Sequence, residues 1–201
     1  MHINDSLNLV FPIRSDEKGV RVYGYHTPIS NEVFEANFII LAATKASLTS
    51  KGIHYLMDSG PRIAALTLKS EARKDAQERG DMDKDGEPSA ASAHALLAEL
   101  KRLTMIVAPT PNGWDSVPVE TAIAQGVIDK DDWAEAEAAL TFFTCHYALT
   151  KRSERRKVIP ATASVLMGSS TSSTLSEFLG SLQTSTQDAP IEEKAGSSVP
   201  S

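Results

Sequence analysis

The sequence predicts a mainly α-helical fold of the α+β class, in which an N-terminal β-hairpin precedes a small helical bundle and a disordered Ser/Thr-rich C-terminal tail. Three observations support this prediction. Apolar residues alternate at period two near the N-terminus, they recur at helical spacing through the middle of the chain, and Ser and Thr dominate beyond Pro160. We therefore expect a hairpin plus helical domain over residues 1–158, with a loop insertion at about 77–90, and a flexible tail over 159–201.

The segment from Leu7 to Tyr25 is typical of a β-hairpin. LNLVFPI holds apolar residues at period two, namely Leu7, Leu9, Phe11 and Ile13; SDEKG supplies a turn, and VRVYGY returns. Pro12 indicates that the first strand lies at an edge, because proline has no N–H to donate to a neighbouring strand.

A long helix is expected to begin at Ser30, whose hydroxyl oxygen suits an N-cap, and to end before Gly52. Further helices are expected from Pro61, over about 89–107 and over about 119–125. A last long helix follows Asp129, and its apolar positions include Phe142 and Phe143. Between the third and fourth helices, PTPNGWDSVP is expected to form a compact loop anchored by Trp114.

The bulk composition excludes several classes of protein. The chain has 201 residues with 26 acidic and 20 basic side chains, a formal charge of −6, which favours solubility over binding of phosphate backbones. No apolar run approaches the roughly 18 residues that span a bilayer, and the N-terminus lacks the pattern of a secretion signal. A single cysteine, Cys145, cannot form an internal disulfide, which fits a reducing cytoplasm.

The sharpest local motif is DMDKDG at 81–86, which matches the first half of an EF-hand calcium loop. The second half fails, because the twelfth position is Ser92, which cannot supply the bidentate carboxylate, and Pro88 removes a backbone N–H. We therefore interpret the segment as a solvated acidic loop and expect no metal site there.

No arrangement of residues in the sequence indicates catalysis. Cys145 and His146 are neighbours on a helix, so their side chains point about 100° apart. Gly-rich phosphate loops, a nucleophile elbow and zinc-ligand spacing are absent from the sequence. We expect no enzyme, no catalytic residue and no cofactor.

Two segments have both a structural and a functional interpretation. The basic run KRSERRK at 151–157 is favoured as a cationic cap on the preceding helix over a nucleic-acid patch. The amphipathic segment 175–182 inside the tail carries four apolar residues at the i, i+3, i+4, i+7 spacing of a docking helix: Leu175, Phe178, Leu179 and Leu182. Docking on a partner and docking on its own domain are equally compatible with this pattern.

The order of these segments resembles a known family. A hairpin is followed by TPISNEVFEANFIILAATKASL, then by the acid-capped helix DDWAEAEAALTFFTCHYAL, and then by a Ser/Thr tail that contains SEFLGSLQTST. This order resembles tail assembly chaperones of long-tailed bacteriophages. The resemblance implies a non-enzymatic factor in the host cytoplasm that binds and solubilises the helical tape measure protein, assists assembly of the tail tube protein, and is absent from the mature virion.

If the resemblance holds, client contacts are expected from surplus apolar residues. The candidates are Phe34 and Phe38 on the first long helix, Phe142 on the last, and the four apolar residues of the tail segment. Self-association is an additional expectation, whereas membrane binding is not expected and nucleic-acid binding is disfavoured. Two alternatives remain: a phage structural component such as a tail-completion or head–tail joining protein, and a small nucleic-acid-binding regulator that uses residues 151–157.

Overall fold

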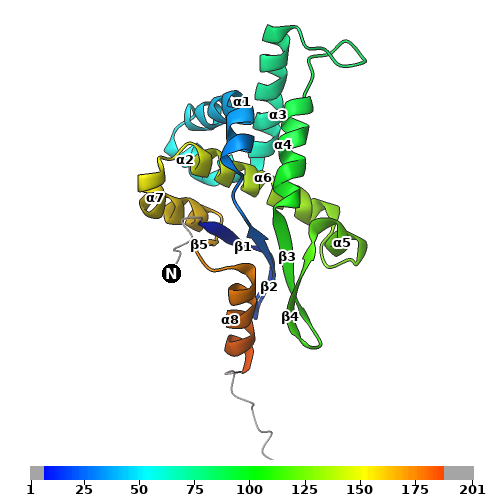
Figure 1. Cartoon of the computed structure of the whole chain (residues 1–201), viewed down its shortest axis with the longest axis vertical. Coiled ribbons are helices and arrows are strands. Elements are labelled where there is room, and N and C mark those ends of the chain that lie inside the picture. The colour runs from blue at the N-terminus through cyan, green and yellow to red at the C-terminus, as the bar shows by residue number, and fades with distance from the viewer. Residues whose placement is uncertain (1–6, 188–201) are drawn as a thin grey trace, which may run out of the picture.

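The protein folds around one five-stranded antiparallel sheet with the strand order β4-β3-β2-β1-β5 (Figure 1). The structure, a computed structural model, describes residues 7–187. The strands are β1 (Asn8–Asp16), β2 (Gly19–His26), β3 (Thr104–Thr110), β4 (Gly113–Pro118) and β5 (Ser169–Thr171). The helices are α1 (Asn31–Thr49), α2 (Ile53–Asp58), α3 (Gly60–Arg79), α4 (Ala91–Arg102), α5 (Val119–Ala124), α6 (Lys130–Ala148), α7 (Arg152–Val165) and α8 (Leu175–Gln187).

The N-terminal hairpin and the two long capped helices are confirmed. β1 pairs with β2 in antiparallel register across a turn at Gly19, whose φ of 117° favours glycine. The Ser30 hydroxyl accepts the N–H of Val33 at the start of α1. Asp129 forms a reciprocal capping box with Asp132 at the start of α6.

The predicted fold class is wrong, because a second hairpin completes a five-stranded sheet. Residues expected at the end of a helix and in a compact loop form β3 and β4, and β3 pairs with both β2 and β4. Pro109 is tolerated because β3 pairs with β2 only as far as Val107. The turn at Pro111–Asn112 closes the hairpin against Gly113, which has a φ of 113°.

The predicted tail is also wrong as far as Gln187, because the chain continues in ordered elements. α7 runs through Pro160, and Ile159 and Ala163 on either side of it are fully buried. β5 then pairs with the start of β1, from Asn8 to Val10, so β1 is not the edge strand; Pro12 lies beyond this pairing. The remaining part of the predicted tail, 188–201, lies outside the described residues.

The two faces of the sheet have different covers. Alternate residues Leu9, Phe11, Val22 and Ile106 point into a large core shared with the helical layer. Their neighbours Val10, Tyr25 and Val107 point to the opposite face, where only apolar residues of α8 and two further aromatic side chains pack on them. In Figure 1, α8 accordingly lies against the sheet away from the helices that gather at the other end.

α3 remains helical and partly buried through its polar second half. It extends to Arg79, and Ala72 and Ala76 are buried on the side where α3 meets α4. The left-handed Gly80 ends it, and residues 80–90 form the exposed loop. No helix within residues 7–187 is long and apolar enough to cross a membrane.

Candidate client-binding surfaces

A groove of about 870 Å³ opens between β1, α2, α3, α6 and the end of α7. Its walls carry Phe11 and Ile13 from β1 and Leu166 from the turn after α7. This volume is in the range of a ligand-binding cleft. Two of the walls of the groove are α3 and α6, which pack against each other.

Alanines form much of the groove where α3 and α6 meet. Ala65 on α3 and Ala138 on α6 are buried, and Ala134 is exposed one turn before Ala138. Small side chains permit the backbone of another helix to approach closely. Lys69 and Glu137 face each other across this region at 4.0 Å between Nζ and Oε2, so the lining combines apolar and charged groups.

Three large apolar side chains border the groove and remain open to solvent. Met57 on α2 is 48% exposed, Leu66 on α3 is 67% exposed, and Met167 after α7 is 83% exposed. Methionine is flexible and polarisable, and methionine-rich surfaces adapt to partners of varied shape. Neighbouring exposed apolar side chains around a groove are typical of a site that binds another protein.

Met167 also adopts a backbone conformation that disfavours its side chain. Its φ is 53°, and it is the one non-glycine residue with positive φ between residues 7 and 187. It occupies the position after the C-cap of α7, where glycine is preferred, and the N–H groups of Met167 and Gly168 bond to the carbonyls of Ser164 and Ala163. A non-glycine residue with this backbone conformation is uncommon, and such residues are enriched at functional sites.

The backbone at Met167 is held in place by its neighbour. A Cβ at Gly168 would lie 2.5 Å from the carbonyl oxygen of Val10 and 3.0 Å from Cβ of Phe11. The chain therefore turns at Met167 so that Gly168 can lie directly on β1 and lead into β5. This contact fixes the backbone beside Met167, whose exposed side chain lies at the border of the groove.

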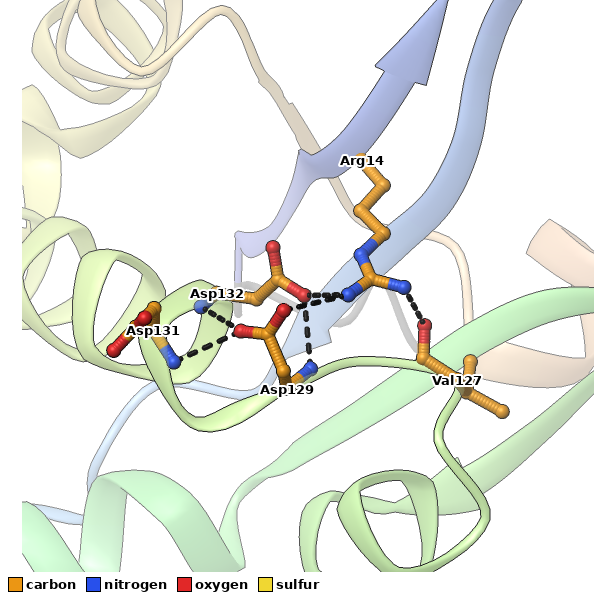
Figure 2. A network of polar contacts seen from close by, with 5 residues as sticks. All are labelled: Arg14, Val127, Asp129, Asp131 and Asp132. Atoms are coloured by element: carbon orange, nitrogen blue, oxygen red, sulfur yellow. Dashed lines mark hydrogen bonds and ion pairs between the residues drawn. The ribbon is translucent and has the colours of Figure 1, made fainter.

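An ionic network connects β1 to the start of α6 (Figure 2). Arg14 on β1 reaches Asp129 and Asp132 at the start of α6, and its other terminal nitrogen donates to the carbonyl of Val127 at 3.0 Å. The side-chain hydrogen bond to Asp132 raises the pKa of Arg14. The backbone N–H of Asp132 and, to a smaller extent, that of Asp131 and the charge of Arg14 lower the pKa of Asp129 against the opposing effect of burial. The network thus links β1 to the start of α6, and one of its members, Asp132, also lines the groove.

The seven predicted client residues lie in three different environments. Phe34 is half-buried and Phe38 is 50% exposed on α1, where their rings meet edge-on at 6.0 Å. Phe142 is 1% exposed and packs beside Gly60 and His146, so its ring does not contribute to the surface. The four apolar residues of α8 pack on the outer face of the sheet: Leu175, Phe178, Leu179 and Leu182. In the described structure the amphipathic segment therefore docks on its own domain.

The groove residues were missed by the sequence interpretation. Met57 and Leu66 belong to short or mixed apolar runs that do not distinguish a core position from an exposed one. Met167 stands beside Gly168 in a Ser/Thr-rich stretch that composition placed in a tail. The one available signal was Gly168 directly after Met167, since a glycine is common where a helix ends.

The titratable groups singled out from the sequence are engaged in the fold. Cys145 is fully buried, and burial raises the pKa of its thiol to about 12. Nδ1 of His146 lies 2.8 Å from the carbonyl oxygen of Phe142, and burial lowers its pKa. Asp83 in the acidic loop accepts the N–H groups of Asp85 and Glu87. Within residues 7–187, no three His, Cys, Asp or Glu side chains gather as ligands for a metal ion.

The basic run lies at the start of α7 rather than at the end of α6. Lys151 is the N-cap of α7, so most of the run belongs to this following helix. Arg155 nevertheless reaches back: its Nε donates to the carbonyl of Thr150, and its guanidinium lies 4.4 Å from the ring centre of Tyr147. Arg155 therefore links the two helices, but the run does not cap α6 as expected, because Thr150 lies beyond the C-cap of α6 and the run begins α7.

Comparisons with protein-family models, with curated proteins and with solved structures returned no match to this chain.

Proposed function

We propose that this protein is a non-enzymatic assembly chaperone of the phage-tail type, which binds helical segments of a tape measure protein in the groove bordered by Met57, Leu66 and Met167. The order of sequence segments that resembles such chaperones supports the proposal. The exposure of these three apolar side chains around an 870 Å³ groove is the observation that carries it. In this proposal the protein acts in the host cytoplasm, assists assembly of the tail tube protein, and is absent from the mature virion.

The chemistry of the groove suits a helical client. An amphipathic helix can lie along the alanines between α3 and α6 and bury its apolar face against the methionines. The polar face of such a helix remains beside Lys69, Glu137 and the exposed Glu135. The net charge of −6 keeps a complex with an apolar client soluble.

Two observations on residues 151–157 support this proposal over nucleic-acid binding by that segment. The guanidinium of Arg155 contacts the ring of Tyr147 and the carbonyl of Thr150, and Glu154 places a negative charge within the run. Phe34 and Phe38 form a second exposed apolar area on α1, which we propose as an auxiliary client contact or as a surface for self-association.

Co-expression tests the proposal directly. The client to be tested is a long helical tape measure candidate sought among the neighbouring genes, and we expect it to be soluble and to co-purify only when this protein is present. The triple variant M57Q/L66Q/M167Q should reduce recovery of the client by about tenfold, because polar side chains remove the apolar border without entering the core. The single variant F38S measures how much the exposed ring on α1 contributes to recovery of the client.

The matched control is M82Q/V158T, which removes two exposed apolar side chains outside the groove. It should recover as much client as the wild type does. If the client is equally soluble without this protein and the two do not co-purify, the chaperone function is excluded. If the triple variant recovers as much client as the control, the groove is not the binding site.

A further inference from the structure

The outer face of the sheet is an apolar surface that α8 covers. Val10, Tyr25 and Val107 are buried beneath this helix, and Tyr23 and Trp114 border it. Phe178 is the central side chain of α8: its ring meets Tyr23 edge-on at 5.7 Å and stacks on Tyr25 at 6.0 Å between ring centres. Without α8, three aromatic rings and two valines would form one open surface.

The packing of α8 on this face is weak. Leu175, Phe178, Leu179 and Leu182 all remain partly exposed, in contrast to the sheet residues beneath them. α8 is rich in Ser and Thr and contains Gly180, residues that disfavour a helix interior. A helix of this length is not stable in water without a surface on which to pack. Its order therefore depends on the sheet, whereas the sheet is also held by β-pairing and by the core.

The start of α8 is attached by a buried polar cluster. The carbonyl of Ser173 accepts the Tyr25 hydroxyl at 2.8 Å and Nδ2 of Asn8 at 3.1 Å, and Asn8 also donates to the Tyr25 oxygen at 2.7 Å. A reciprocal capping box between Thr174 and Glu177 then starts the helix. α8 is thus fixed at its N-terminal end and packed through one apolar stripe further along.

We propose that the outer face of the sheet is a second helix-binding surface, on which α8 is the resident occupant and from which it is displaced by an amphipathic helix of a protein partner. The occupant that the surface fits is defined by α8 itself: leucines at i, i+4 and i+7 with an aromatic ring at i+3. A partner helix with this pattern and with better helix-forming residues at the exposed positions replaces α8, which pivots about Ser173. This surface lies across the sheet from the groove, so the inference stands independently of the proposed function.

Because α8 competes for the face, its stability sets the apparent affinity for a partner. The test uses the full-length protein and a fluorescein-labelled peptide with the α8 sequence SSTLSEFLGSLQTSTQ, followed by fluorescence anisotropy. Phe178→Glu removes the central ring and should tighten peptide binding at least tenfold, because the face is vacated. Gly180→Ala acts in the opposite direction. A Cβ at Gly180 meets nothing within 4 Å, so alanine strengthens the resident helix and should weaken peptide binding about threefold.

Ser176→Glu is the matched control, since it adds the same charge to α8 at an exposed position. It should bind the peptide as the wild type does. A peptide with benzoylphenylalanine at the Phe178 position should crosslink to β2 and β4 near Tyr23 and Trp114. Crosslinks to the groove around Met57 and Met167 would overturn the assignment of the surface.

Three other results would overturn the proposal. The first is a folded Phe178→Glu variant, judged by circular dichroism, that does not bind the peptide. The second is that this variant self-associates and that the peptide does not reverse the association; the occupant of the face would then be a second copy of the chain. The third is binding of phosphatidylcholine–phosphatidylglycerol vesicles with no binding of the peptide. If Phe178→Glu does not fold, equal peptide affinity of the wild type and Gly180→Ala would have the same consequence.

Discussion

The two faces of the sheet are built from adjacent residues of the same strands, yet they are packed to different degrees. On the inner face Leu9, Phe11 and Ile106 join a core of helices in which large side chains are almost fully excluded from water. On the outer face Val10, Tyr25 and Val107 depend on one Ser/Thr-rich helix whose own apolar residues remain partly exposed. The comparison indicates that the inner face holds the main core, and it supports our proposal that the outer face is an interaction surface on which α8 is the intramolecular occupant.

The largest expected effect comes from removing an aromatic ring on the inner side. Phe143→Ala should lower the free energy of unfolding by about 3–5 kcal/mol, because Phe143 is fully buried between His26 and Tyr147 and its loss leaves a cavity. Urea unfolding measures this difference. Phe38→Ala is the matched control, and its half-exposed ring should contribute less than about 1 kcal/mol. Equal effects of the two variants would contradict the assignment of Phe143 to the core.

Local signals in the sequence predicted the elements whose ends are fixed by their own residues. Ser30 and Asp129 accept N–H groups of their own helices, so α1 and α6 could be placed without knowledge of the rest of the fold. The first hairpin was placed by its alternation and by its turn at Gly19. These features require no contact between distant segments.

The second hairpin could not be predicted in the same way, because its identity depends on a distant partner. Leu100, Leu103 and Val107 continue the spacing of an apolar helix face, and the helix was therefore extended too far. In the structure β3 leaves the helical path because its backbone pairs with β2, 78 residues earlier in the case of His26 and Thr104. Such pairing is a non-local contact that short-range periodicity does not contain.

The prediction of a disordered tail after Pro160 was wrong because it was based on composition. A Ser/Thr-rich composition indicates that few side chains are buried, but it says nothing about whether the backbone pairs with another strand. β5 needs only three residues, and its order comes from hydrogen bonds to β1. α8 needs four apolar side chains and an apolar face opposite them, and that face was invisible while β3 was assigned to a helix. The candidate groove was likewise hidden, since Met167 borders it only because Gly168 lies against β1.

The next largest effect is a pH dependence of stability that comes from His26. This residue points to the inner face of the sheet, whereas Tyr25 beside it points to the outer face. His26 is fully buried beside Phe143, its Nδ1 lies 2.9 Å from the Thr104 hydroxyl, and burial lowers its pKa to about 3. In the unfolded state His26 binds a proton near pH 6.5, whereas in the folded state it does not. The contribution of neutral His26 to the free energy of unfolding is therefore fully present above pH 6.5 and is lost as the pH falls from 6.5 toward 3. Between pH 7.5 and pH 5 the loss should be about 2 kcal/mol.

His26→Gln tests this because glutamine can still donate to Thr104 but does not titrate. Between pH 7.5 and pH 5, the free energy of unfolding of this variant, measured with urea, should fall by about 2 kcal/mol less than that of the wild type. His146 has a pKa that burial also lowers, so His146→Gln is the comparison that leaves the His26 contribution in place. Glu99 acts on His26 in the opposite direction to burial. An unchanged pH profile in His26→Gln would show that His26 is accessible to protons in the folded state.

A smaller and more local effect is expected on the outer face. Phe178→Ala should destabilise the packing of α8 by about 1.5 kcal/mol, because the ring is only partly buried and rests on one surface. Hydrogen exchange should therefore accelerate about tenfold for the amides of α8 while the amides of α6 keep their protection. Equal acceleration in both helices would indicate that α8 unfolds together with the core, and the distinction between the two faces would not hold.

The smallest effect separates stability from binding at the border of the groove. Met167→Gly should raise the free energy of unfolding by about 0.5–1 kcal/mol, because glycine adopts a φ of 53° without the steric cost that methionine carries. Met167→Ala keeps that cost and loses only an exposed side chain, so its stability should match the wild type. Thermal unfolding measures both variants, and co-purification of the client measures their binding. If the Met167 side chain is retained for binding at the expense of stability, both variants should recover less client although one is more stable than the wild type. Full recovery by Met167→Gly would assign Met167 to the local turn alone.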